Sequence, residues 1–308
     1  MNMNFPQLKG LIAAPFTPMN EDGSINPSLI ERYYQFLKRN GVTGAFICGS
    51  TGEGVSLTLN EKMEIMAAWA AATAQDDDFK VMTLLGGTCL ADCIVLAKLA
   101  SSLGLYGVSF TAPSYFKPAN ARALADMCAE IAAAVPEMPF YYYHIPVLTG
   151  ANMNMIDLLA EVDGRIPNFA GIKYTHEDFM DFLSCMNFNN RKYDMLWGRD
   201  ENMLSALVLG TKAAVGSTFN YVAPLYHQLI EAFESNNLEQ AVALQQQSID
   251  FIRLLGKFGG IATGKAYLRH AGIDCGEFRL PVKNMDAAAY AQFQTEVDAI
   301  GFQTYKSV

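Results

Sequence analysis

The sequence has no apolar run that approaches the roughly 18 residues of a membrane-spanning helix. Its opening residues, MNMNFPQLKGLIAAPF, also lack a basic segment followed by a long apolar one. Positive charge is scarce: 22 Lys and Arg stand against 31 Asp and Glu, and they form no basic cluster. We therefore expect neither a membrane nor a nucleic acid as a partner, and we expect a cytoplasmic location.

Paired cysteine spacings are missing as well. The six cysteines are scattered, most of them in apolar segments where free thiols pack as small hydrophobic groups: Cys48, Cys89, Cys93, Cys128, Cys185 and Cys275. Structural disulfides and a metal site are therefore not expected. Cys89 and Cys93 lie one helical turn apart and could bind a metal, but no histidine lies nearby, so packing is the favoured interpretation.

What the chain does contain is a regular alternation of strand and helix patterns. Short apolar, β-branched or aromatic segments occupy residues 9–16, 44–49, 80–85, 107–112, 139–144, 169–174, 194–198 and 213–217. Helical patterns separate them. One spans 26–41, with Asn26 as N-cap, Pro27 at the first position and Gly41 as the stop, and another spans 58–74, opened by Thr58 and Glu61 at capping-box spacing.

This alternation predicts an α/β fold. Segments that are apolar on both faces suit a parallel sheet covered by helices, and eight strand–helix units within about 230 residues favour a closed (β/α)₈ TIM barrel. An open doubly wound sheet is the alternative. After Pro224 only helical patterns follow. We therefore predict a barrel over residues 1–235 and a C-terminal helical bundle over 236–308, packed on the barrel.

Barrel enzymes place their chemistry at the carboxyl ends of the strands, and there the segment FAGIKY ends on Lys173. A lysine surrounded by low-dielectric barrel walls would have a lowered pKa, so that its neutral amine could attack a carbonyl carbon. The alternative is a lysine whose ammonium reaches solvent or pairs with a carboxylate.

The segment at 139–144 ends in YYYHIPVLTG, and Tyr143 is the candidate acid and base at this rim. Side chains alternate along a strand, so Tyr141 and Tyr143 face one side and Tyr142 the other. His144 could serve as the base instead, but it alternates away from Tyr143. We therefore interpret His144 as a packing residue.

The carboxyl ends of three further predicted strands also carry polar groups. In CGSTGEGVSLT, the Gly-Ser-Thr-Gly turn offers backbone N–H groups and the hydroxyls of Ser50 and Thr51 to a carboxylate or phosphate, although a tight turn explains the glycines equally well. It lacks the Gly-Lys-Ser/Thr ending of a nucleotide loop, and Glu53 is expected to support the turn from outside. WGRDEN and VGSTFN add possible hydroxyl binders, among which Asp200 and Glu201 equally suit the first turn of a helix.

With GSTGEG, YYYHIPVLTG, GIKYT, WGRDE and VGSTFN in this order, nearly the whole chain resembles the class I pyruvate aldolases of the N-acetylneuraminate lyase and dihydrodipicolinate synthase family. The resemblance implies a Schiff base on Lys173, proton transfer by Tyr143, a carboxylate site at Ser50 and Thr51, and no cofactor. It also implies that Tyr115 reaches the site of a neighbouring subunit, and hence a homotetramer.

One position separates the branches of the family. The synthases carry an arginine five residues after the tyrosine, where this chain has Leu148, which cannot clamp a second carboxylate. The resemblance to the lyase branch implies cleavage of N-acetylneuraminate to N-acetylmannosamine and pyruvate. The sugar would bind at Thr175, Gly198, Asp200, Glu201 and Ser217. Another pyruvate-dependent aldolase, or a non-catalytic sensor of keto acids or sialic acid, is the alternative.

Overall fold

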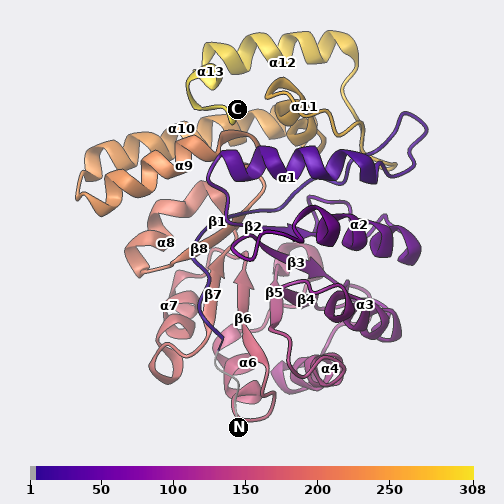
Figure 1. The fold of residues 1–308 in the computed structure, drawn as a ribbon. Helices are drawn as coiled ribbons and strands as arrows, with labels where there is room; N and C mark the ends of the chain where they lie inside the picture. The colour runs from indigo at the N-terminus through magenta and orange to yellow at the C-terminus, as the bar shows by residue number, and fades with distance from the viewer. Residues whose placement is uncertain (1–4) are drawn as a thin grey trace.

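The computed structural model describes residues 5–308, which form a closed barrel of eight parallel strands in chain order (Figure 1). The strands are β1 (Gly10–Ala13), β2 (Gly44–Ile47), β3 (Lys80–Leu84), β4 (Gly107–Thr111), β5 (Phe140–His144), β6 (Phe169–Tyr174), β7 (Asp194–Trp197) and β8 (Ala213–Gly216). Each lies within one of the eight predicted segments. The TIM barrel is confirmed, and because β1 pairs with β8 the open-sheet alternative is wrong.

Helices follow the strands around the barrel. They are α1 (Ile30–Arg39), α2 (Leu59–Ala72), α3 (Leu90–Ser102), α4 (Ala121–Ala133), α5 (Pro146–Thr149), α6 (Met155–Val162), α7 (Phe179–Asn187), α8 (Met203–Leu209) and α9 (Phe219–Glu234), with 3-10 turns η1 (Pro27–Leu29), η2 (Phe188–Asn190) and η3 (Asp200–Asn202). The capping box of Thr58 and Glu61 is confirmed at α2. Asn26 caps no backbone N–H, because its side chain accepts a bond from Ser28 and the chain enters α1 through η1.

Alternation along the strands separates two buried layers. Tyr141 and Tyr143 belong to the cluster inside the barrel, together with Phe46 of β2. Tyr142 and Tyr174 belong to the larger cluster between the sheet and the helices. The predicted facing of the three tyrosines is therefore confirmed, and the interior of the barrel is the layer toward which the functional side chain of β6 must point.

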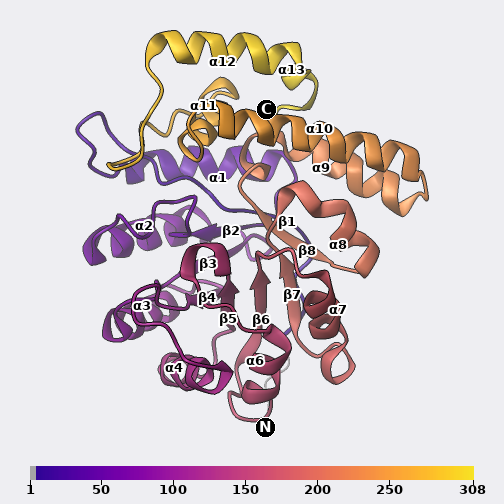
Figure 2. The ribbon, with the colours of Figure 1, turned by 180° about the vertical axis from the view of Figure 1, so that it is seen from behind.

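The C-terminal part of the chain is helical, as predicted, with α10 (Leu238–Lys257), α11 (Ala262–His270), α12 (Ala287–Ala299) and α13 (Phe302–Tyr305). These helices gather beside α1 and α9 at one end of the molecule, and the view from behind shows the same arrangement (Figures 1 and 2). The side chain of Asn40, at the end of α1, exchanges two hydrogen bonds with the backbone of Val308. A domain boundary at residue 235 stays a prediction.

Other expectations concern single residues and the surface. The six cysteines are all free, and only Cys89 among them is exposed. The helix predicted from Pro224 begins earlier, at Phe219, so that Pro224 lies inside α9, just after a break in helical geometry at Val222. Among residues 5–308, no helix combines the length and the apolar character needed to cross a membrane.

Candidate active site

Lys173 lies inside the barrel and is only 4% exposed. Its Nζ atom is 4.0 Å from the ring centroid of Phe46 and 4.0 Å from that of Tyr143. Burial lowers the pKa of Lys173 to about 7, and the carboxylate of Asp200 acts in the opposite direction. Within the described part of the chain, Lys173 forms no ion pair, so the salt-bridged alternative has no support. A sizeable fraction of the amine is neutral near pH 7.

Tyr143 is the immediate neighbour of this lysine on the adjacent strand. The two residues are paired in the register of β5 and β6, and the Tyr143 ring lies 5.5 Å from that of Phe46 at an angle of 72°. Burial raises the pKa of Tyr143, while the hydroxyls of Ser50 and Thr175 act to lower it. The phenol is therefore protonated at neutral pH and has hydroxyl neighbours that can relay a proton.

Residues 48–54, which we call the carboxylate turn, fold tightly at the end of β2. The backbone N–H of Gly54 donates to Gly49 at 3.0 Å, and a side chain on Gly54 would lie 1.8 Å from the carbonyl oxygen of Cys48. Cys48 and Glu53 adopt left-handed φ angles of 56° and 58°. Ser50, at the top of the turn, lines a cavity of about 290 Å³ that also borders Tyr143 and Leu148.

Two predicted site residues of this region, Thr51 and Tyr115, do not line that cavity. Thr51 is buried within the turn and does not line the cavity. Tyr115 follows β4 and is 83% exposed, with its ring against that of Phe116 at 4.9 Å. The Glu53 carboxylate points away from the cavity and binds Lys265 at 2.8 Å, which agrees with the prediction that Glu53 supports the turn from outside.

The predicted sugar-binding residues line the rims of β6, β7 and β8. A side chain on Gly198 would lie 1.9 Å from Oγ1 of Thr175, so only glycine fits beside that hydroxyl. Ser217 is half-buried, and its carbonyl oxygen accepts a bond from Asn220. Glu201 is partly exposed and binds Arg199 at 2.6 Å. These residues share one rim of the barrel.

Asp200 is buried at the same rim and is held by Thr218, which follows β8. One of its carboxylate oxygens accepts bonds from the backbone N–H of Thr218 at 2.9 Å and from the Thr218 hydroxyl at 2.7 Å. Burial raises the pKa of Asp200 to about 6. Asp200 and Glu201 also form the first turn of η3, which agrees with the alternative prediction that they begin a helix. The second carboxylate oxygen lies against Gly216, where a side chain would be 2.2 Å away.

Sequence reasoning missed two members of the site. Phe46 read as an ordinary core residue, although alternation within 44–49 would have placed it on the inner face with Tyr143. Thr218, the partner of Asp200, gave no signal beyond its place in VGSTFN. His144 lies outside the barrel, against the rings of Tyr174 and His176, and burial lowers its pKa to about 3. This placement agrees with the packing role predicted for His144.

Comparisons with known proteins agree with this architecture. The model of the dihydrodipicolinate synthetase family matches residues 7–300. N-acetylneuraminate lyase of Rattus norvegicus is 38% identical over 98% of this chain and 96% of its own length. The solved structure of Proteus mirabilis N-acetylneuraminate lyase is 35% identical, covers 96% of this chain and 100% of that chain, and superposes with a TM-score of 0.93. That of the Aliivibrio salmonicida lyase is 34% identical, with the same TM-score. The chain therefore belongs to the dihydrodipicolinate synthetase family.

Proposed function

We propose that this protein is an N-acetylneuraminate lyase, a carbon–carbon lyase that reversibly cleaves N-acetylneuraminate to N-acetylmannosamine and pyruvate. The observation that carries the proposal is a buried lysine that forms no ion pair within residues 5–308 and packs against Tyr143, whose phenol has the hydroxyls of Ser50 and Thr175 as neighbours. The names of the relatives support the substrate. Several of them, from mammals and bacteria, are N-acetylneuraminate lyases and match nearly the full length.

The chemistry begins at Lys173. Its neutral amine attacks the keto carbon of the open-chain sugar acid, and loss of water gives a protonated imine. Tyr143 donates its phenolic proton to the hydroxyl that leaves as this water. The resulting phenolate then takes the proton from the hydroxyl on the carbon to be released, and the carbon–carbon bond breaks. Its electron pair moves into the iminium to form an enamine, and the released carbon becomes the aldehyde of N-acetylmannosamine. Protonation of the enamine and addition of water free pyruvate and restore Lys173.

The two ends of the substrate require different partners. Ser50 and Thr51 would bind the carboxylate next to the reacting carbon, through hydroxyl and backbone donors of the carboxylate turn. Thr175, Asp200, Glu201 and Ser217, around Gly198, would bind the hydroxyls of the sugar beyond the cleaved bond. Leu148 borders the cavity with no charge to offer. A second carboxylate in the substrate would therefore find no bidentate partner there.

We further propose a homotetramer in which Tyr115 completes the proton relay of a neighbouring subunit. The support is its exposure: Tyr115 and Phe116 are each 83% exposed, and they follow Ser114, which lines the cavity. Large aromatic groups of this kind are common at interfaces between subunits. The cytoplasmic location stays a prediction from the sequence.

The test is cleavage of N-acetylneuraminate, measured beside a panel of short keto acids and sugar acids. Lyase activity predicts release of pyruvate from N-acetylneuraminate in preference to the rest of the panel. Glu201→Gln should weaken that cleavage while leaving borohydride trapping of pyruvate on Lys173 intact, because pyruvate does not reach the β7 rim. A parent protein that prefers another acid would refute the lyase proposal, and one that traps no pyruvate would refute the aldolase chemistry.

A further inference from the structure

Glu53 is the one acidic residue of the carboxylate turn, and both of its carboxylate oxygens accept hydrogen bonds from the C-terminal part of the chain, from α11 and from the loop between α11 and α12. Its Oε1 atom accepts a bond from Lys265 of α11 at 2.8 Å, and its Oε2 atom accepts one from the backbone N–H of Arg279 at 2.9 Å. The side chains of Lys265 and Glu53 are 4% and 3% exposed. A buried ion pair therefore joins the turn to a helix that lies outside the barrel.

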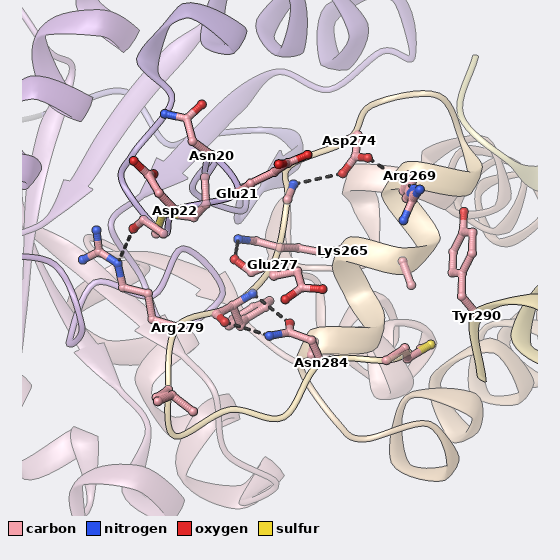
Figure 3. A pocket seen from close by; sticks show the side chains of 18 residues that line it. Asn20, Glu21, Asp22, Lys265, Arg269, Asp274, Glu277, Arg279, Asn284 and Tyr290 are labelled. Atoms are coloured by element: carbon pink, nitrogen blue, oxygen red, sulfur yellow. Dashed lines mark hydrogen bonds and ion pairs between the residues drawn. The ribbon is translucent and has the colours of Figure 1, made fainter. Parts of the chain in front are cut away.

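Lys265 lies at the edge of a second cavity, of about 1030 Å³, between residues 19–23 and the C-terminal segment (Figure 3). There its Nζ atom also donates to the carbonyl oxygen of Glu277 at 2.9 Å. In the same loop, the guanidinium of Arg279 binds Glu61 and the carbonyl oxygens of Gly23 and Ser56. Arg279 therefore binds the chain both before and after the carboxylate turn.

The turn needs such support because of its backbone conformation. Cys48 and Glu53 both lie in the left-handed region, which is unfavourable for residues with a side chain and persists only where the surroundings hold it. On its other side, the hydroxyl of Thr17 donates to the carbonyl oxygen of Gly52 at 2.5 Å. The bonds of Glu53 therefore lie where they can fix the orientation of the neighbouring Ser50 and Thr51.

We propose that Lys265 and Glu53 are positioning residues, which hold the carboxylate turn so that Ser50 and Thr51 can bind the carboxylate of the keto acid. The proposal rests on the proposed function of that turn. Neither residue touches the substrate, because both face away from the cavity at Tyr143. If the pair only stabilised the fold, its loss would weaken every ligand equally. A positioning role predicts a loss that depends on the carboxylate of the ligand.

The experiment compares pyruvate with acetone, which offers the same carbonyl group without a carboxylate. Each is trapped with borohydride, the adduct on Lys173 is measured by mass spectrometry, and its half-saturating concentration is determined. The test variant is Lys265→Met combined with Glu53→Gln, which removes both charges and keeps an acceptor for Arg279. The matched control is Lys257→Met, which breaks the more exposed ion pair between Lys257 of α10 and Glu296 of α12.

We expect half-saturation by pyruvate to rise about tenfold or more in the double variant, with half-saturation by acetone unchanged. The control should match the parent for both ligands. An equal rise for both ligands, or none for pyruvate, would overturn the positioning role while leaving the aldolase proposal intact. If the parent binds pyruvate no better than acetone, the carboxylate turn itself is misassigned and the inference falls with it.

Should the double variant fail to fold, Lys265→Arg replaces it. That variant keeps the charge but presents a larger planar group, which cannot occupy the position of the ammonium beside Glu53. The same selective loss, smaller in size, is expected for pyruvate alone. Parent-like values for both ligands in a folded Lys265→Arg protein would refute the inference.

Discussion

Two lysines of this protein are equally buried, at 4% exposure each, and both lie over aromatic rings, yet their polar partners differ. Lys173, inside the barrel, packs against two aromatic rings and forms no ion pair among the described residues. Lys265, in α11, binds a buried carboxylate and a carbonyl oxygen. Burial lowers the pKa of both. At Lys173 the carboxylate of Asp200 opposes the shift only from a distance, whereas at Lys265 the carboxylate of Glu53 opposes it through a direct hydrogen bond as well. A buried lysine can act as a nucleophile only where no bound carboxylate keeps its amine protonated.

The largest expected effect comes from Lys173→Met, which keeps the shape of the side chain and removes the amine. Borohydride trapping of pyruvate and turnover should both be abolished. The melting temperature near pH 7 should stay equal or rise, because a group whose charged form is disfavoured by burial is lost. Peptide mapping of the trapped adduct and a thermal melt check this. Trapping on Lys265 or Lys212 in the parent would contradict the comparison.

Lys265→Met should affect stability where Lys173→Met does not. It leaves the carboxylate of Glu53 buried without its cation, which costs about 3–5 kcal/mol of unfolding free energy. Urea unfolding measures the change. Lys257→Met, at the exposed pair with Glu296, is the control and should change stability by about 1 kcal/mol or less. Equal changes in unfolding free energy for the two substitutions would show that the buried pair contributes no more to stability than the exposed one.

Tyr143→Phe sharpens the account of Lys173, because it keeps the aromatic ring beside Nζ and removes only the hydroxyl. Turnover should fall by roughly 10²-fold or more if the phenol transfers the proton. Steady-state cleavage and trapping at saturating pyruvate are measured on the same preparation. The adduct should still form on Lys173. Near-parental turnover would transfer the role to another group.

The pH dependence of imine formation tests the pKa of Lys173 directly. The neutral amine is the nucleophile, so the rate should rise about tenfold per unit below pH 7 and level off above it. In Asp200→Asn the midpoint should move to lower pH, because the carboxylate that favours the ammonium is gone. Glu201→Gln, at the same rim, should leave the midpoint in place. A midpoint near the ordinary 10.5 of lysine would refute the neutral-amine account.

How much of this was predictable differs between the barrel and its site. The eight strands, the facing of the tyrosines and the place of Lys173 at a strand end followed from local apolar patterns. These patterns express which side chains must leave water, and they repeat within a few residues. The start of α1 was misjudged because Asn26 bonds to Ser28 instead of capping the helix, a choice between two local hydrogen bonds.

The sequence by itself determined the barrel and the residues at its rims, because periodic burial depends only on neighbouring positions. The tertiary structure alone decided which of those residues meet. Closing the barrel brought Phe46 of β2 to Lys173 of β6, and it paired Asp200 with Thr218 across two rims. The ion pair of Glu53 and Lys265 spans 212 positions. Contacts of that kind leave no trace in local periodicity, because a charge in a turn or on a helix has the same local pattern whether it faces water or a buried partner.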